Sequence, residues 1–298
     1  MDRQDRGGTE RQSPAWPSAR SRVVGVIGDP IRHSLSPRLH NAAFDALGLD
    51  WVSVAFEVAS GQAAAALEGA RALGLAGLSV TMPHKEPVAA AVDERTEVAE
   101  RLGAVNCVTV VDGRLVGDST DGEGFLLALR RATGFDPSGR RCLVIGAGGA
   151  ARAVVLALAE AGAAEVSVLN RDGARAEVAA TLAGARGRVA APADLGEAEL
   201  VVQATPVGME GSAALHPLVD AGRLHAGQVV YDIVYLPAVT ELLQAAHAAG
   251  ARAVGGLGML VHQAALALER WTGADVPVEP MWASVADIAG PGVTSSSP

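Results

Sequence analysis

The stretch Arg141–Ala153, RCLVIGAGGAARA, constrains the fold more than any other part of this chain. Its first half, Cys142–Ile145, is a short apolar run typical of a buried parallel strand. Glycines follow at once in a G-x-G-x-x-A spacing that starts at Gly146, and residues 150–161 predict an uninterrupted alanine- and leucine-rich helix. A strand, a glycine turn and a helix in this order indicate one βαβ unit of a doubly wound sheet.

The same turn indicates what the unit binds. Gly146 lets the chain leave the strand sharply, Gly148 leaves room for a pyrophosphate, and Ala151 lets the helix pack closely on the strand. The helix N-terminus offers unpaired N–H groups and a partial positive charge to phosphates. Such turns also occur as packing devices, but the strand before it and the helix after it favour a dinucleotide site.

Composition excludes several classes of protein. With 24 basic against 33 acidic residues, the net charge of −9 argues against a nucleic-acid partner. No apolar run is long enough for a membrane span, and the seven histidines form no recognisable metal pattern, so we expect no membrane partner and no metal. Cys107 and Cys142 fall in predicted strands, as expected of reduced core thiols in a cytoplasmic protein.

Alternating strand and helix patterns predict an α/β fold with two domains and a parallel sheet in each. Residues 1–21 are polar and arginine-rich and predict a disordered extension, and 291–298 a tail. Between them we expect one α/β domain over 22–122, a Rossmann-type domain with a linker helix over 123–257, and helices over 258–290 that return to the first domain. The oligomeric state stays open, with a homodimer as the candidate assembly.

Local signals locate several elements in the first domain. Ser36 followed by Pro37 predicts the N-cap and first residue of a helix. Residues 86–102 predict a single helix of mixed charge, and Asp112-Gly113 predicts a hairpin between strands over 104–111 and 114–116.

Three predicted loops of this domain carry polar side chains suited to a ligand. Ser34 and Ser36 lie beside a helix start, a natural place for a carboxylate, although Ser36 as a plain cap explains the pattern equally well. Lys85 comes just after a predicted strand, where α/β proteins place ligand-binding groups, and the alternative is a solvated surface lysine. Asp121 suits either a helix cap or a functional carboxylate.

The type of dinucleotide depends on the end of the second strand of the Rossmann unit. That strand ends in Asn170 and Arg171, and Arg175 follows about one turn later. An acidic residue here would accept the ribose 2′-hydroxyl of NAD, whereas arginines pair with the 2′-phosphate of NADP. The arginines favour NADP, and Asp172 in the same loop is the one feature against it.

Taken together, the motifs resemble the shikimate dehydrogenase family over about residues 22–290. The resemblance is carried by GDPIRHSLSPRLHN (28–41), GLSVTMPHK (77–85), GAVN (103–106), GDSTDGEG (117–124), GAGGAARA (146–153), NRDGAR (170–175), ATPVGM (204–209), YDIVYLPAVTELL (231–243) and GGLGMLVHQA (255–264). It implies an N-terminal substrate domain completed by the C-terminal helices and a Rossmann-type NADP domain. The implied activity is reversible NADPH-dependent reduction of 3-dehydroshikimate to shikimate, in the synthesis of aromatic amino acids by way of chorismate.

The resemblance also assigns roles residue by residue. It implies Lys85 and Asp121 as the catalytic pair, with Lys85 either transferring the proton or polarising the oxygen. The implied substrate-binding residues are Ser34, Ser36, Thr81, Lys85, Asn106, Asp121, Tyr235 and Gln263. The implied cofactor-binding residues are Gly146, Ala147, Gly148, Gly149, Ala150, Asn170, Arg171, Arg175, Ile233 and Gly256.

Two alternatives remain beside this interpretation. One is an NAD-linked quinate/shikimate dehydrogenase of quinate catabolism, against which Arg171 and Arg175 argue. The other is a non-catalytic sensor that binds shikimate or quinate, which would be expected to lack the Lys85 and Asp121 pair. This chain departs from common family residues in several places, among them Gln203 and Ser119, where asparagine is frequent, and Ile233, where methionine is common.

Overall fold

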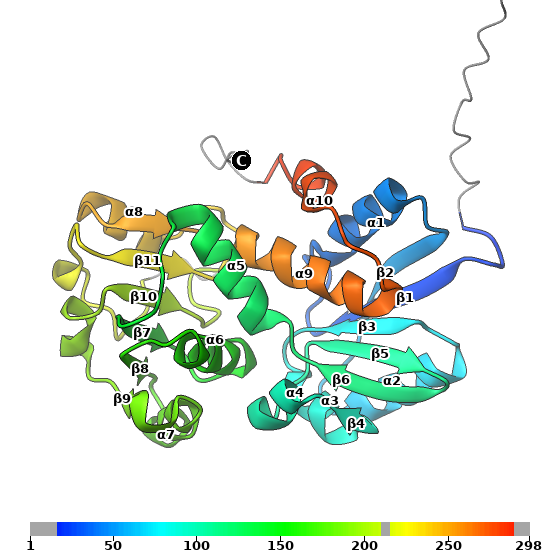
Figure 1. Ribbon diagram of the computed structural model, residues 1–298, viewed down its shortest axis with the longest axis horizontal. Helices are drawn as coiled ribbons and strands as arrows, with labels where there is room; N and C mark the ends of the chain where they lie inside the picture. Colours follow the sequence, from blue (N-terminus) through cyan, green and yellow to red (C-terminus); the bar gives the residue numbers. More distant parts are fainter. Residues whose placement is uncertain (1–16, 210–214, 289–298) are drawn as a thin grey trace, which may run out of the picture.

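The computed structural model describes residues 17–209 and 215–288, which form two α/β lobes with two helices between them (Figure 1). Most of the expected N-terminal extension and all of the expected 291–298 tail lie outside these residues. Within the described ranges, no helix is long and apolar enough to cross a membrane. The predicted two-domain α/β fold is confirmed.

The N-terminal lobe contains a six-stranded mixed sheet in the order β2-β1-β3-β5-β6-β4. Its strands are β1 Arg22–Gly28, β2 Trp51–Glu57, β3 Gly77–Val80, β4 Glu94–Arg95, β5 Cys107–Val111 and β6 Arg114–Asp118. β1 runs parallel to β2 and β3, but β5 is antiparallel to both β3 and β6. The expected parallel sheet is therefore wrong for this lobe. The predicted hairpin is confirmed, because Asp112 and Gly113 both have positive φ (50° and 77°) and fold β6 back along β5.

Helices cover both faces of this sheet. The helices are α1 Ser36–Leu47, α2 Ala63–Ala72, α3 Lys85–Ala91, α4 Glu97–Leu102, α9 Leu257–Thr272 and α10 Val278–Ser284. Phe44 of α1, Trp271 of α9 and Met281 of α10 belong to one buried cluster, so the C-terminal helices complete the core of the N-terminal lobe. Leu67 of α2 and Val88 of α3 belong to the cluster on the other face.

The single helix expected over 86–102 is wrong, since α3 ends at Ala91 and a new helix, α4, begins at Glu97. Between them the chain adds β4 to the edge of the sheet, next to β6. Asp93 favours this break because its carboxylate accepts the N–H of Leu115 at 2.7 Å. Thr96 then caps α4 by accepting the N–H of Ala99 at 3.3 Å.

The C-terminal lobe has a six-stranded, fully parallel sheet in the order β12-β11-β10-β7-β8-β9. Its strands are β7 Arg141–Ile145, β8 Glu165–Leu169, β9 Gly187–Val189, β10 Leu200–Gln203, β11 Val229–Asp232 and β12 Arg252–Val254. Its helices are α6 Gly149–Glu160, α7 Gly173–Thr181, α8 Glu241–Ala248 and the short 3-10 helices η1 Gly184–Arg186, η2 Pro192–Gly196 and η3 Ala221–Arg223. Numbered from β7, the strand order is 3-2-1-4-5-6, that of a dinucleotide-binding sheet.

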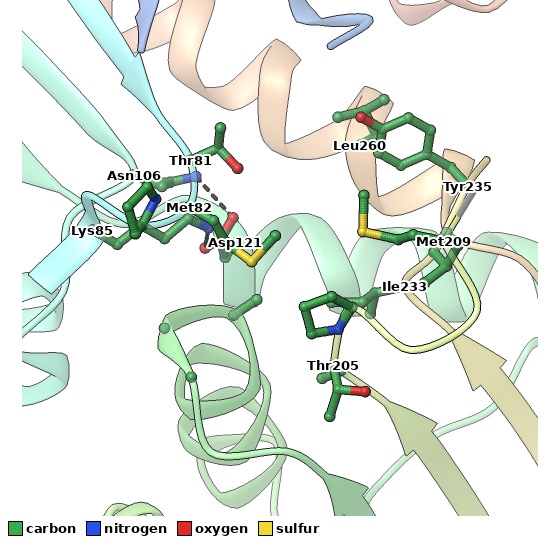
Figure 2. Close-up of a pocket in the computed structure, with 18 of the residues that line it drawn as sticks. Thr81, Met82, Lys85, Asn106, Asp121, Thr205, Met209, Ile233, Tyr235 and Leu260 are labelled. Carbon is green, nitrogen blue, oxygen red and sulfur yellow. Dashed lines mark hydrogen bonds and ion pairs between the residues drawn. The ribbon is translucent and has the colours of Figure 1, made fainter. Parts of the chain in front are cut away.

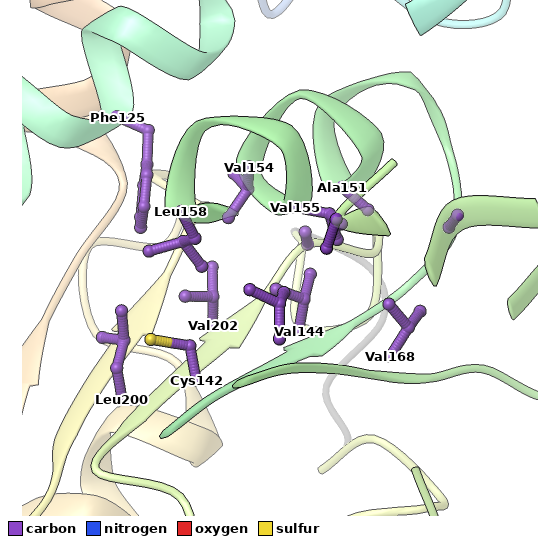
Figure 3. Packing of buried hydrophobic residues seen from close by; sticks show 14 of the residues in the cluster. Phe125, Cys142, Val144, Ala151, Val154, Val155, Leu158, Val168, Leu200 and Val202 are labelled. Atoms are coloured by element: carbon purple, nitrogen blue, oxygen red, sulfur yellow. The ribbon is translucent and has the colours of Figure 1, made fainter. Parts of the chain in front are cut away.

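α6 packs on one face of this sheet through a continuous apolar stripe (Figure 3). Val154 and Leu158 of the helix lie against Val144 and Val202 of β7 and β10, and all four side chains are fully buried. The alanine-rich sequence of α6 allows the close approach. The glycine turn that precedes α6 is thereby fixed at the end of β7.

Two helices lie between the lobes, α5 Asp121–Thr133 and α9, and they pack against each other along their length (Figure 1). Gly124 permits the close crossing, since a Cβ at this position would lie 2.6 Å from the backbone nitrogen of Gln263. The N-terminus of α5 and the middle of α9 therefore meet beside the cleft that both lobes share.

The two sheets present their switch points to that cleft. A switch point lies between two neighbouring parallel strands whose following loops lead away in opposite directions. In the N-terminal lobe these strands are β1 and β3, and in the C-terminal lobe they are β7 and β10. Ligands of α/β proteins bind at such points. The topology therefore places both sets of predicted site loops around one space.

Candidate functional site

The cleft between the lobes has a volume of about 1120 Å³ and is lined from both sides. The predicted site residues other than Gly146 all line it. They are Ser34, Ser36, Thr81, Lys85, Asn106, Asp121, Ala147, Gly148, Gly149, Ala150, Asn170, Arg171, Arg175, Ile233, Tyr235, Gly256 and Gln263. Gly146 lies directly beneath, at the end of β7, and is buried.

An ion pair joins the two residues expected to be catalytic. The Lys85 ammonium donates to a carboxylate oxygen of Asp121 at 2.5 Å, and the two side chains are 16% and 7% exposed (Figure 2). Lys85 is the first residue of α3, just after β3, and Asp121 is the first residue of α5. The surface-lysine alternative does not fit, because the Lys85 side chain is largely buried. The cap alternative for Asp121 does not fit either, because Thr120 occupies the N-cap position of α5.

A buried amide network fixes the carboxylate of Asp121. The Asn106 amide nitrogen donates to the second Asp121 oxygen at 2.9 Å, to the Thr120 hydroxyl at 2.9 Å and to the Gln263 side-chain oxygen at 3.2 Å. The Thr120 hydroxyl in turn donates to the Gln263 carbonyl at 3.0 Å. The network brings together residues from the loop before β5, from α5 and from α9. Asp121 is thereby held with one oxygen on Lys85 and the other on Asn106.

The predicted carboxylate pocket lies at the start of α1, with one correction. Leu35, not Ser36, occupies the N-cap position, and Ser36 is the first helical residue. The Ser34 hydroxyl takes the capping role instead, since its oxygen accepts the Ser36 N–H at 3.3 Å. Ser36 is therefore not required as a cap. Tyr235 enters the same cleft from the loop after β11 (Figure 2).

The glycine turn has the geometry its sequence predicts. Gly146 adopts φ = 119°, and a Cβ there would lie 2.8 Å from the Ala204 carbonyl oxygen. Gly148 is the N-cap of α6 in an extended conformation, and a Cβ on it would meet no atom within 4 Å. The backbone at Gly148, where α6 begins, therefore faces open space in the cleft, as a bound pyrophosphate requires.

The loop after β8 resolves the conflict between Asp172 and the arginines. The Asp172 carboxylate caps α7 by accepting the Arg175 N–H at 3.1 Å, and the Asn170 amide donates to the Asp172 carbonyl at 3.0 Å. Arg171 and Arg175 are exposed at the rim of the cleft. The Arg175 guanidinium lies 3.9 Å from the Glu86 carboxylate across the cleft. Asp172 is thus engaged as a cap, and the two arginine side chains lie at the rim of the cleft.

Several lining residues were not among the predicted site residues. The loop after β10 contributes Thr205 and Met209 (Figure 2), and His216 and Glu86 lie further along the wall. Burial first, and then the positive charge of Arg171, lowers the pKa of His216. The sequence could have indicated Thr205 and Met209, because both belong to the ATPVGM motif, which follows a buried strand. Nothing in the local sequence indicates His216.

Burial also changes the acidity of two further groups near the cleft. It raises the pKa of the Tyr235 phenol above its usual range. It raises the pKa of Asp232 to about 6, even though the Thr240 hydroxyl and the Val234 N–H both donate to that carboxylate. In the described part of the chain, no group of three or more His, Cys, Asp or Glu side chains is arranged to hold a metal ion.

The fold and the cleft together define a class of protein. A parallel sheet in dinucleotide-binding order has its glycine turn open to the cleft, and a lysine–carboxylate pair faces that turn from the other lobe. This is the construction of a two-domain dinucleotide-binding oxidoreductase.

Comparison with known proteins narrows the class. Three family models match: the shikimate dehydrogenase substrate binding domain over residues 26–108, shikimate / quinate 5-dehydrogenase over 127–231, and the shikimate 5'-dehydrogenase C-terminal domain over 256–286. The NADP(+)-dependent shikimate dehydrogenase of Methanopyrus kandleri is 48% identical over 90% of this chain and 96% of its own. The chain belongs to the shikimate dehydrogenase family, as its motifs predict.

Solved structures agree with this assignment. The shikimate dehydrogenase of Thermus thermophilus, solved with NADP(H) and shikimate, superposes with a TM-score of 0.83 at 38% identity, covering 90% of this chain and 99% of its own. The quinate dehydrogenase of Corynebacterium glutamicum, solved with NAD, gives a TM-score of 0.81 at 31% identity, covering 90% and 99%. The fold is thus shared by both specificities within the family.

Proposed function

We propose that this protein catalyses the reversible NADPH-dependent reduction of 3-dehydroshikimate to shikimate, a step in aromatic amino-acid synthesis by way of chorismate. The Lys85–Asp121 pair carries the proposal. It is largely buried, joined through Asn106 to Gln263, and located in a cleft that also contains an open glycine turn. The family membership and the cofactor named for relatives that are 44–48% identical support it.

The residue types suit this chemistry. In the reductive direction the ketone carbon gains a hydride and its oxygen gains a proton, and bound NADPH supplies the hydride. Lys85 supplies the proton or polarises the oxygen, and Asp121 orients both Lys85 and the substrate hydroxyl. Ser34 and Ser36 bind the substrate carboxylate at the start of α1, while Thr81, Asn106, Tyr235 and Gln263 bind the ring hydroxyls.

The cofactor site fits NADP. The first turn of α6, with Gly146–Ala150 before and within it, holds the pyrophosphate, and Asn170, Arg171 and Arg175 surround the 2′-phosphate. Ile233 and Gly256, which also line the cleft, would contact the nicotinamide of a bound cofactor. Asp172 uses one carboxylate oxygen to cap α7, which supports the arginines over this aspartate as the residues that select the cofactor.

Replacing one arginine tests the 2′-phosphate site. We expect Arg171→Ala to raise the KM for NADP by about tenfold or more, because it removes a charge-assisted contact, while the KM for NAD changes little. Arg223→Ala is a control, since Arg223 is an exposed arginine of the same lobe outside the cleft. Equal changes in the two KM values would contradict the assignment.

An absorbance assay crossing shikimate and quinate with NADP and NAD tests the function itself. The proposal expects the highest kcat/KM for shikimate with NADP. A preference for quinate with NAD would instead favour the catabolic dehydrogenase. Binding of shikimate without turnover in any combination would favour a sensor, which the intact Lys85–Asp121 pair argues against.

Domain organisation, assembly and location extend the proposal. We propose a substrate domain over 22–122 and an NADP domain over 123–257, with 258–290 returning to the first domain, and a hinge near 122–139 and 255–258 where the chain crosses.

A homodimer is proposed because β2 has a strand neighbour on one side only within the described residues, and its Val54 and Phe56 are 37% and 40% exposed. The buried free thiols of Cys107 and Cys142 support a cytoplasmic location. Light scattering of the purified protein tests the assembly.

A further inference from the structure

A buried polar cluster lies behind the cofactor side of the cleft, formed by Gln203, Asp232 and Thr240. These side chains are 1%, 1% and 2% exposed. Gln203 ends β10 and Asp232 ends the neighbouring strand β11, while Thr240 precedes α8. Gln203 stands where asparagine is frequent in the family, and no predicted site role uses any of the three.

Gln203 holds the loop after β10. Its amide nitrogen donates to the Thr205 carbonyl at 3.1 Å and to the Val207 carbonyl at 2.8 Å, and its amide oxygen accepts the Thr205 N–H at 2.6 Å. Both Thr205 and Val207 line the cleft. Three hydrogen bonds from one buried side chain therefore help to hold this loop.

Asp232 holds the loop after β11 and connects it to Gln203. One carboxylate oxygen accepts the Val234 N–H at 3.0 Å and lies 3.4 Å from the Gln203 amide nitrogen. The other oxygen accepts the Thr240 hydroxyl at 2.7 Å, and that hydroxyl oxygen accepts the Leu243 N–H at the start of α8. Two loops and a helix start thus meet at one carboxylate.

We infer that Gln203, Asp232 and Thr240 are positioning residues that set the spacing of the 204–209 and 233–240 loops, between which the nicotinamide half of the cofactor is bound. The inference rests on the proposed function, since it concerns the cofactor side of the same cleft. Ile233 and Met209 face this space from the two loops (Figure 2). A shift in either loop changes the contacts that a bound nicotinamide meets.

Gln203→Asn tests the inference because it shortens the side chain by one methylene group while keeping the amide. The shorter amide no longer reaches Val207 and Asp232 together. We expect the KM and Kd for NADPH to rise on the order of tenfold and kcat to fall, with the KM for shikimate changing little. The Kd is measured by NADPH fluorescence, independently of turnover.

Gln228→Asn is the matched control. Gln228 is also 1% exposed and lies in the same lobe, where its amide donates to the Leu195 and Ala198 carbonyls at 2.7 Å and 2.9 Å. It does not line the cleft. This variant is expected to lose thermal stability with unchanged Kd and KM for NADPH. Equal kinetic constants in Gln203→Asn and Gln228→Asn would overturn the inference.

A second pair of variants probes the other end of the cluster. Thr240→Val removes the hydroxyl and should weaken NADPH binding, whereas Thr240→Ser keeps the hydroxyl and should restore it. Failure of Thr240→Ser to restore binding would contradict the hydroxyl's role. The proposed function fails separately, if the wild-type protein itself does not reduce 3-dehydroshikimate with NADPH.

Discussion

At the scale of single residues, the site depends on Lys85 and on the groups that hold its carboxylate partner. Lys85→Ala should lower kcat by about 10³-fold or more, because it removes the group that supplies or stabilises the transferred proton. Shikimate binding, measured by calorimetry, should remain within a few-fold of wild type, since Ser34, Ser36 and Asn106 are untouched. Turnover close to the wild-type rate would show that Lys85 is not catalytic.

Asp232 gives a second prediction at this scale, on stability. Its pKa in the folded protein, about 6, lies above the usual value of 3.8, so its contribution to stability is fully present at low pH and is lost as the pH rises through about 6. Asp232→Asn removes this titration and keeps a polar group of the same size. Between about pH 4 and about pH 8, the difference in unfolding free energy between wild type and variant should shift by about 2.5 kcal/mol in the variant's favour.

Denaturant unfolding of both proteins across that pH range measures this difference. In the Asp232→Asn variant the side-chain oxygen still accepts the Val234 N–H, but the new amide must donate to Thr240, so the variant has a constant cost at every pH. The prediction concerns only the slope with pH. A difference that does not vary with pH would contradict the raised pKa.

At the scale of elements, the start of α6 lies close to Lys85, the proposed catalytic lysine, and also forms part of the proposed cofactor site. A Cβ on Gly149 would lie 3.1 Å from Lys85 Cδ and 3.4 Å from its Cβ, whereas a Cβ on Gly148 would meet no protein atom within 4 Å. Gly149→Ala should therefore displace Lys85 and lower kcat several-fold with little change in the KM for NADP. Gly148→Ala should raise the KM for NADP, because its methyl group faces the pyrophosphate.

Steady-state kinetics of the two alanine variants separates these effects, and each variant is the control for the other. Both glycines have backbone conformations outside the left-handed region, so the added methyl group causes no backbone strain in either. The same kinetic change in both variants would mean that Gly149 does not position Lys85.

Sequence patterns predict some elements better than others, for local physical reasons. The β7–α6 unit is predictable because apolar run, glycine turn and helix are contiguous. The break between α3 and α4 is not, because Asp93 forms it by binding the N–H of Leu115, which is distant in sequence. The N-cap of α1 is missed by one residue because Ser34 reaches forward to the Ser36 N–H. Likewise, the close approach of Gly149 to Lys85 arises only when the two lobes meet.

At the scale of the whole molecule, the lobes are joined by more than the two helices between them. Leu102 and Ala104 of the N-terminal lobe form a small buried cluster with Ala153 and Leu156 of α6. The Arg152 guanidinium of α6 also lies 3.2 Å from the Glu86 carboxylate of α3. The family motifs predict which loops face the cleft. They do not predict this contact between α6 and the N-terminal lobe, because its residues are spread over several parts of the sequence.

Leu156→Ala tests whether this contact makes the two lobes unfold together. The truncation should cost about 2–3 kcal/mol and weaken the coupling between lobes, so that calorimetry shows a broadened or split transition. Leu143→Ala is the matched control, because Leu143 is fully buried inside the C-terminal sheet, away from the other lobe. It should cost as much or more yet leave one cooperative transition. If both variants unfold in a single transition of unchanged sharpness, then this apolar cluster is not needed to couple the lobes.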